Sequence, residues 1–171
     1  MTNTTSANLY AYEFGQTRTY IAAALFVIGN ILLPQLFHLV PKGGMTWLPI
    51  YFFTLVGAYK YGWRVGLVTA VASPLANSAM FGMPVPAALP AILTKSVLLA
   101  VGAGFVQSRF RKASLPLLVG VVAFYQSVGS LAEWAMSGSL YAALQDIRMG
   151  LPGMALQVLG GYACIRYLIR K

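Results

Sequence analysis

The chain has 171 residues, of which 58% are hydrophobic and 9% are charged, and its formal net charge is +9. A soluble domain carries about a quarter charged residues, so this composition excludes an ordinary soluble protein. The apolar runs are continuous rather than alternating, which excludes a β-barrel and predicts an all-α integral membrane protein with one domain. The basic residues lie between apolar runs instead of along one face, so they predict no nucleic-acid partner.

The polar start of the chain, residues 1–17, has no positive charge before Arg18 and lacks the basic region of a signal peptide. We expect it to form a cytoplasmic tail, with a six-helix transmembrane domain over residues 18–171. A membrane-spanning helix needs about 20 apolar residues. Six segments qualify or nearly qualify: Thr19–Phe37, Trp47–Tyr61, Val65–Phe81, Pro86–Val106, Leu115–Met136 and Leu151–Ile169.

The second and third segments are short and are separated only by Gly62-Trp63-Arg64. A single long helix would place Lys60 and Arg64 in mid-membrane, so a tight hairpin is the less costly interpretation. Lys42 and Arg148 fall on one side of the six-span arrangement. The other side holds nine basic residues: Arg18, Lys60, Arg64, Arg109, Arg111, Lys112, Arg166, Arg170 and Lys171. The positive-inside rule therefore predicts that both termini are cytoplasmic.

Lys95 lies alone within the apolar run of the fourth segment. A lysine at bilayer depth costs roughly 3 kcal/mol on insertion scales, and such residues usually face a bundle interior or a wet cavity. His38, Asn77, Glu133 and Gln157 fall at similar depth in the outer half, counting 1.5 Å per helical residue. Together they predict a substrate-binding cavity open to the outside.

Each of these residues also has a structural interpretation. Lys95 and Glu133 form an ion pair in one alternative, and Asn77 and Gln157 serve as interhelical hydrogen bonds. His38 is also expected at the interface. Two tryptophans on the pocket side, Trp47 and Trp134, are expected either in the aromatic belt or stacked on a ligand ring.

The outer loops contain two turns rich in glycine and proline, which we expect to act as gates over the cavity. Their candidate residues are Lys42, Gly43, Gly44, Gly82, Met83 and Pro84. In the last outer loop, apolar residues recur at helical spacing with Gln145, Asp146 and Arg148 between them. This pattern predicts a short interfacial helix over Tyr141–Met149.

The sequence carries no phosphate-binding Gly-x-x-x-x-Gly-Lys-Ser/Thr loop, so ATP hydrolysis by this chain is not expected. One histidine, one cysteine and three acids are too few for a typical metalloenzyme site, and Cys164 alone forms no disulfide framework. We expect no catalytic activity, metal or cofactor. Energy for transport would have to come from a partner.

The length, the six segments and the outer cavity resemble the substrate-binding S-components of the energy-coupling factor (ECF) vitamin transporters of prokaryotes. The likeness extends from about Tyr20 to Arg170. It is greatest in Trp47-Leu48-Pro49-Ile50-Tyr51 through Tyr61-Gly62-Trp63-Arg64-Val65-Gly66, in Ser73-Pro74-Leu75 followed by Gly82-Met83-Pro84, and in Gly150-Leu151-Pro152-Gly153 followed by Gln157.

The resemblance implies a multi-pass protein of the cell membrane that binds a vitamin or vitamin precursor with high affinity. It also implies a transmembrane coupling subunit and two ATPases as partners. Family members often dock through Ala-x-x-x-Ala on the first span, whereas this chain has Ala22, Ala23 and Ala24, with Thr19/Ala23 as the nearest match. The outer loops that cover the ligand in that family correspond here to Lys42–Trp47 and Phe81–Pro86.

Three other functions remain open at this point: a membrane scaffold or assembly protein, a stand-alone secondary transporter and an intramembrane enzyme acting on lipid. The sparse catalytic inventory disfavours the enzyme. A buried lysine favours an anionic or carbonyl-bearing ligand, unless Glu133 already neutralises Lys95.

Overall fold

The computed structural model describes residues 9–168, and this part of the chain is helical, with no strand in it. The elements follow in the order α1 (Thr17–His38), α2 (Gly43–Trp47), the 3₁₀ turn η1 (Pro49–Tyr51), α3 (Phe52–Tyr61), α4 (Trp63–Phe81), α5 (Leu89–Phe110), α6 (Leu115–Ser137), α7 (Leu140–Ala143), α8 (Gln145–Met149), α9 (Leu151–Ala163) and the π-helical turn η2 (Cys164–Leu168). Residues 1–8 of the expected tail lie outside the described residues, as do Arg170 and Lys171.

Each of the six predicted segments overlaps a helix of the structure, and the all-α prediction is confirmed for the described residues. Three helices there are long and apolar enough to cross a membrane, namely α1, α5 and α6, which indicates a membrane protein. The helix α3 has ten residues and spans about 15 Å, half of a typical hydrocarbon core. It begins late because Leu48 is left-handed, with φ of 45°, and the 3₁₀ turn starts at Pro49.

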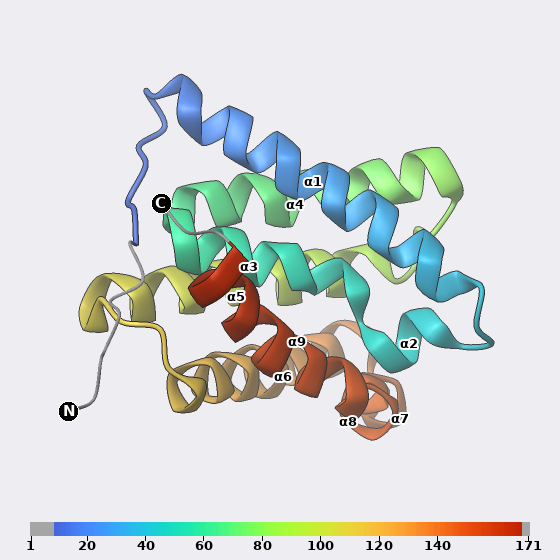
Figure 1. The fold of residues 1–171 in the computed structure, drawn as a ribbon. Helices are drawn as coiled ribbons and strands as arrows, with labels where there is room; N and C mark the ends of the chain where they lie inside the picture. The colour runs from blue at the N-terminus through green and yellow to red at the C-terminus, as the bar shows by residue number, and fades with distance from the viewer. Residues whose placement is uncertain (1–8, 169–171) are drawn as a thin grey trace.

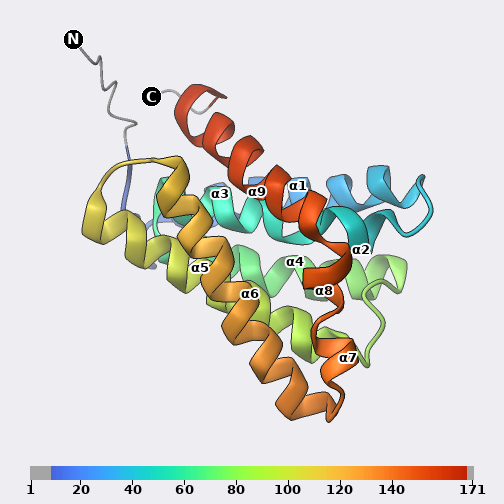
Figure 2. The ribbon, with the colours of Figure 1, turned by 90° about the horizontal axis from the view of Figure 1, so that it is seen from below.

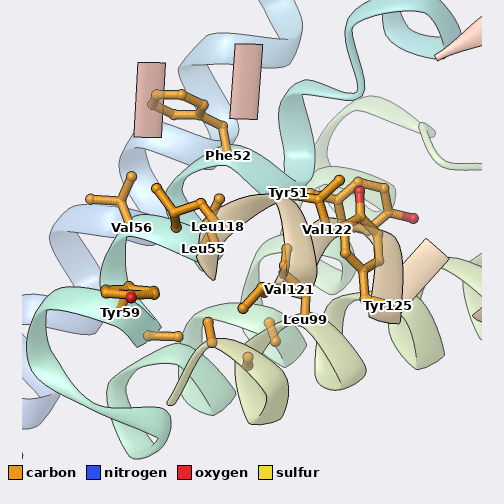
Figure 3. Packing of buried hydrophobic residues seen from close by; sticks show 14 of the residues in the cluster. Tyr51, Phe52, Leu55, Val56, Tyr59, Leu99, Leu118, Val121, Val122 and Tyr125 are labelled. Carbon is orange, nitrogen blue, oxygen red and sulfur yellow. The ribbon is translucent and has the colours of Figure 1, made fainter. Parts of the chain in front are cut away.

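The short helix α3 forms the centre of the bundle, where it packs against α1, α4, α5 and α9. Figure 2 shows α9 lying across α3, with α5 and α6 side by side. Eight of the ten α3 residues are buried, so the helix is surrounded by protein rather than by lipid. Figure 3 shows the apolar side chains of α3, among them Leu55 and Val56, packed with Leu99 of α5 and Val121 of α6.

The predicted hairpin between α3 and α4 is confirmed. Gly62 forms the turn with φ of 99°, a conformation that other residues rarely adopt. One turn into α4, Gly66 lies so close to α3 that a Cβ atom there would overlap the Ala58 side chain, and the same atom would lie 3.2 Å from the Ala100 Cβ of α5. The absence of a side chain at Gly66 therefore permits three helices to meet.

The connections gather at opposite ends of the bundle (Figure 1). The segment around α2, the α4–α5 connection and the pair α7–α8 lie at one end, on the right in Figure 1. The start of α1, the α3–α4 turn, the α5–α6 turn and η2 lie at the other end, on the left. Among the described residues, the left end carries Arg18, Lys60, Arg64, Arg109, Arg111, Lys112 and Arg166, and the right end carries Lys42 and Arg148.

The prediction of one continuous interfacial helix over Tyr141–Met149 is wrong. The structure forms two short helices, α7 and α8, with a break at Leu144. Ser139 caps the N-terminus of α7, where its side chain accepts a hydrogen bond from the Ala142 backbone N–H. The break makes α8 a separate element, which packs against α2 and α9 and carries Asp146.

Candidate functional site

Lys95 is held between two carboxylates inside the bundle. Its side chain is 2% exposed, and its Nζ lies 2.6 Å from Glu133 Oε2 of α6 and 2.7 Å from Asp146 Oδ2 of α8. We call Lys95, Glu133 and Asp146 the ion triplet. The stem of Lys95 crosses α6 at Gly129, where a Cβ atom would lie 2.5 Å from the Lys95 Cγ. A glycine one helical turn before Glu133 therefore lets the ammonium group reach that carboxylate.

The sequence predicts Lys95 and Glu133 in the outer half of the membrane as a candidate ion pair. It does not include Asp146 in the site, because the pattern places Asp146 on the polar face of an interfacial helix. Asp146 lies 51 residues from Lys95 in the sequence. One signal could have found it: the chain has three acids, and only Glu133 and Asp146 fall towards the end of the bundle where Lys95 points. A buried cation must be paired with an opposite charge, so the carboxylates at its end of the molecule are the candidate partners.

A cavity of about 640 Å³ opens beside the ion triplet, at the end of the bundle that carries α2, α7 and α8. Four predicted ligand-binding residues line it: Lys95, Glu133, Asn77 and His38. Five of the six predicted gating residues also line it: Lys42, Gly43, Gly44, Met83 and Pro84. Gly82 is not part of this lining. Most of the remaining wall is apolar and includes Pro34, Leu48, Ile50, Val85 and Ile92.

Three other predicted site residues lie outside the cavity lining. Gln157 is fully buried between helices, and its Oε1 accepts a hydrogen bond of 2.9 Å from the Tyr125 hydroxyl, so it joins α9 to α6. The Trp47 ring packs on Phe37 with 5.4 Å between ring centroids. Trp134 is exposed on α6. The structure therefore places Gln157 as an interhelical contact and both tryptophans away from the lining.

Asn77 is oriented by a buried polar cluster that the sequence did not identify. Asn30 of α1 donates from Nδ2 to Thr54 Oγ1 at 3.0 Å and to Ser73 Oγ at 3.1 Å, and it accepts from the Phe53 backbone N–H. The Asn77 Nδ2 in turn donates to the backbone carbonyls of Asn30 and Ser73. These two bonds fix the amide, and its Oδ1 has no hydrogen-bond partner among the described residues.

The segment Lys42–Trp47, of which Lys42 to Met45 line the cavity, contacts α8. Lys42 adopts φ of 58°, and α2 begins directly after it. Gly43 packs so tightly on the backbone of Phe37 that a Cβ atom would overlap its carbonyl oxygen. From α8, the Gln145 Nε2 contacts the Met45 Sδ at 3.0 Å. One edge of the cavity is thus closed by two short helices that touch through flexible side chains.

The three alanines expected to contact a coupling subunit point in different directions. Ala23 is 1% exposed and packs inside the bundle, whereas Ala24 is exposed and Ala22 is half-buried. The outer surface of α1 is formed by Ile21, Leu25, Ile28 and Leu32 together with Ala24. Of Ala23 and Ala24, only Ala24 is therefore accessible on the outside of α1.

Across the described residues, no three histidine, cysteine, aspartate or glutamate side chains come together as a metal site would require. The chemistry of the cavity is that of charge pairing and hydrogen bonding within an apolar wall. Comparison of the chain with protein-family models, curated proteins and solved structures returns no match.

Proposed function

We propose that the protein is the membrane-embedded binding subunit of an ECF-type importer, which takes up a vitamin or a vitamin precursor. The observation that carries the proposal is the cavity of about 640 Å³ beside the ion triplet, in a bundle whose α1, α5 and α6 are apolar enough to cross a membrane. Small-molecule sites are typically cavities of this size, mostly apolar with a few convergent polar groups. The resemblance of the sequence to S-components supports the same function.

A scaffold protein is the main alternative, because buried polar residues also join helices. Gln157 has such a role here, as does the Asn30 cluster. The Gln157 Nε2 is also buried without a partner in the described part of the chain, but Gln157 lies outside the cavity lining. The Tyr51 hydroxyl and the Asn77 Oδ1, equally without a partner there, belong to residues that line the cavity. Buried polar groups are normally hydrogen-bonded, so these atoms favour a bound molecule over a purely structural role.

The proposed topology has six spans with both termini in the cytoplasm of a prokaryote. It rests on the unequal charges of the two ends of the bundle and on the positive-inside rule. The cavity would then open to the outside, as uptake requires. Three connections, including the one that contains α2, would face the external medium.

The topology is tested by labelling single cysteines in intact cells, in a Cys164→Ser background. Lys42→Cys and Arg148→Cys are expected to react with a membrane-impermeant maleimide added outside, whereas Lys112→Cys is expected to react only after the cells are opened. Lys42, Arg148 and Lys112 are all exposed at the ends of the bundle, so the reaction of a cysteine at each position depends on the side of the membrane. Labelling of Lys112→Cys alone in intact cells would invert the topology.

The binding function is tested by mass spectrometry of small molecules that copurify with the protein in detergent. Ala91 lines the cavity one helical turn before Lys95, so Ala91→Trp fills the site. Ala87 is exposed just before α5 and outside the lining, so Ala87→Trp is the matched control. We expect one compound with the wild-type protein and with Ala87→Trp, and a loss of at least about tenfold with Ala91→Trp.

Two outcomes contradict the proposed binding function. One is the absence of any compound enriched with the wild-type protein over a membrane protein of unrelated fold. The other is equal recovery from Ala91→Trp and Ala87→Trp when both variants have the same melting temperature. In either case the scaffold becomes the better explanation of the buried polar residues.

A further inference from the structure

The ion triplet carries a formal charge of −1, because one ammonium group faces two carboxylates. The side chains of Glu133 and Asp146 are 21% and 18% exposed, and both residues line the cavity. Lys95 is the only hydrogen-bonding or ion-pair partner of either carboxylate group among the described residues. A buried lysine would favour an anionic ligand only if its charge were free. Here two carboxylates neutralise Lys95 and leave one negative charge, so an anionic ligand is not favoured.

The two other basic residues that line the cavity do not cancel this charge at depth. Lys42 and His38 are both exposed. Charges in contact with water are screened, whereas charges within a low-dielectric interior interact strongly. A molecule that enters the cavity as far as Lys95 thus meets a net negative site.

The unpaired polar atoms of the lining independently indicate which hydrogen-bonding groups the ligand carries. The Asn77 Oδ1 is an acceptor, because the Nδ2 of the same amide is committed to two backbone carbonyls. Each carboxylate of the ion triplet has two oxygens, and only Glu133 Oε2 and Asp146 Oδ2 contact Lys95. The unpaired Tyr51 hydroxyl of the lining can donate or accept, whereas the Asn77 Oδ1 and the second oxygen of each carboxylate can only accept. These three acceptors outnumber that one hydroxyl donor at depth, so a complementary ligand supplies N–H groups.

We propose that the cavity binds an organic cation, a small and mostly apolar molecule with a positively charged nitrogen that pairs with Glu133 and Asp146. This inference rests on the proposed function and specifies its ligand class. The charged nitrogen neutralises the ion triplet and donates hydrogen bonds to the free carboxylate oxygens. The apolar body packs against side chains such as Leu48, Ile50 and Ile92, which form the rest of the wall.

The test compares three probes of nearly equal shape and different charge: phenethylamine, which is cationic at pH 7, neutral phenylethanol and anionic phenylpropionate. Dissociation constants are measured by equilibrium dialysis of the purified full-length protein in detergent, with Ala91→Trp as the background for partition into micelles. We expect phenethylamine to bind about tenfold more tightly than either other probe, as one charge-assisted contact provides. Asp146→Asn makes the ion triplet neutral and is expected to remove most of this preference.

Glu13→Gln is the matched control, because it removes one carboxylate from an exposed position at the opposite end of the molecule. It is expected to leave the preference for phenethylamine unchanged. Equal or tighter binding of phenylpropionate overturns the cationic ligand, as does a copurifying compound without a cationic nitrogen, and both results leave the proposed binding function standing. If no probe binds and no compound copurifies, the binding function and its ligand class fail together.

Discussion

Lys95→Met is expected to lower the free energy of unfolding by roughly 3–5 kcal/mol, the usual result of removing one partner from a buried ion pair. Here the substitution leaves two carboxylates, Glu133 and Asp146, facing each other without a cation. Because both are about one-fifth exposed, water offsets part of the repulsion, and the lower part of that range is the better expectation. Unfolding in detergent at constant pH measures the effect.

The partner substitutions separate charge from shape. Asp146→Asn leaves a matched Lys95–Glu133 pair and is expected to cost less than Lys95→Met. The triple variant Lys95→Met/Glu133→Gln/Asp146→Asn carries no buried charge, and it is expected to recover most of the stability that Lys95→Met loses. Lys42→Met, at an exposed position of the same end, controls for the loss of a positive charge.

Equal stabilities of Lys95→Met and the triple variant would contradict this account. They would show that the lysine stem, packed across Gly129, stabilises the fold through its methylene groups rather than its charge. A Lys95→Met variant as stable as the wild type would show that the two carboxylates share a proton or bind another cation in its absence.

Two features of the site could be predicted from sequence because each depends on local pattern and depth. A lysine within an apolar helix must find a carboxylate or a cavity, and Glu133 lies at a matching depth in the next long helix. Asp146 could not be predicted as a site residue from local pattern and depth. It lies in the short helix α8, and its approach to Lys95 depends on the break at Leu144 and on how α8 packs against α2 and α9.

The helices also include features that the local sequence predicts and features that depend on tertiary packing. The turn at Gly62 follows from the cost of placing Lys60 and Arg64 in a membrane, and the chain does turn there. The short length of α3 does not follow from composition, because its apolar side chains are buried by other helices and not by lipid. Apolarity alone does not distinguish these two environments. Depth in turn does not say which face of a helix points to the cavity, which is why Trp47 and Gln157 are predicted in the site and lie outside its lining.

Ligand binding and ligand accumulation are expected to be separable activities. The isolated protein should give almost no uptake, and the protein with its partner subunits should give full uptake. The chain has no phosphate-binding loop, so the protein alone in liposomes should bind its copurifying compound without accumulating it, with or without ion gradients. Addition of an ECF coupling subunit and its two ATPases, with ATP, should give uptake. The measurement is radiolabelled compound retained in the vesicles over time.

The surface through which the partner acts is tested on α1. Ala24→Trp adds bulk to an exposed position, where close packing of another helix depends on small residues, and it should abolish uptake while leaving ligand affinity within about twofold. Leu159→Trp on the exposed face of α9 is the matched control and should preserve uptake. Ala23→Trp would not test docking, because Ala23 is buried and its enlargement disrupts the bundle itself. Gradient-driven accumulation by the isolated protein would refute an energising partner and make the chain a secondary transporter, with the same cavity and a different source of work.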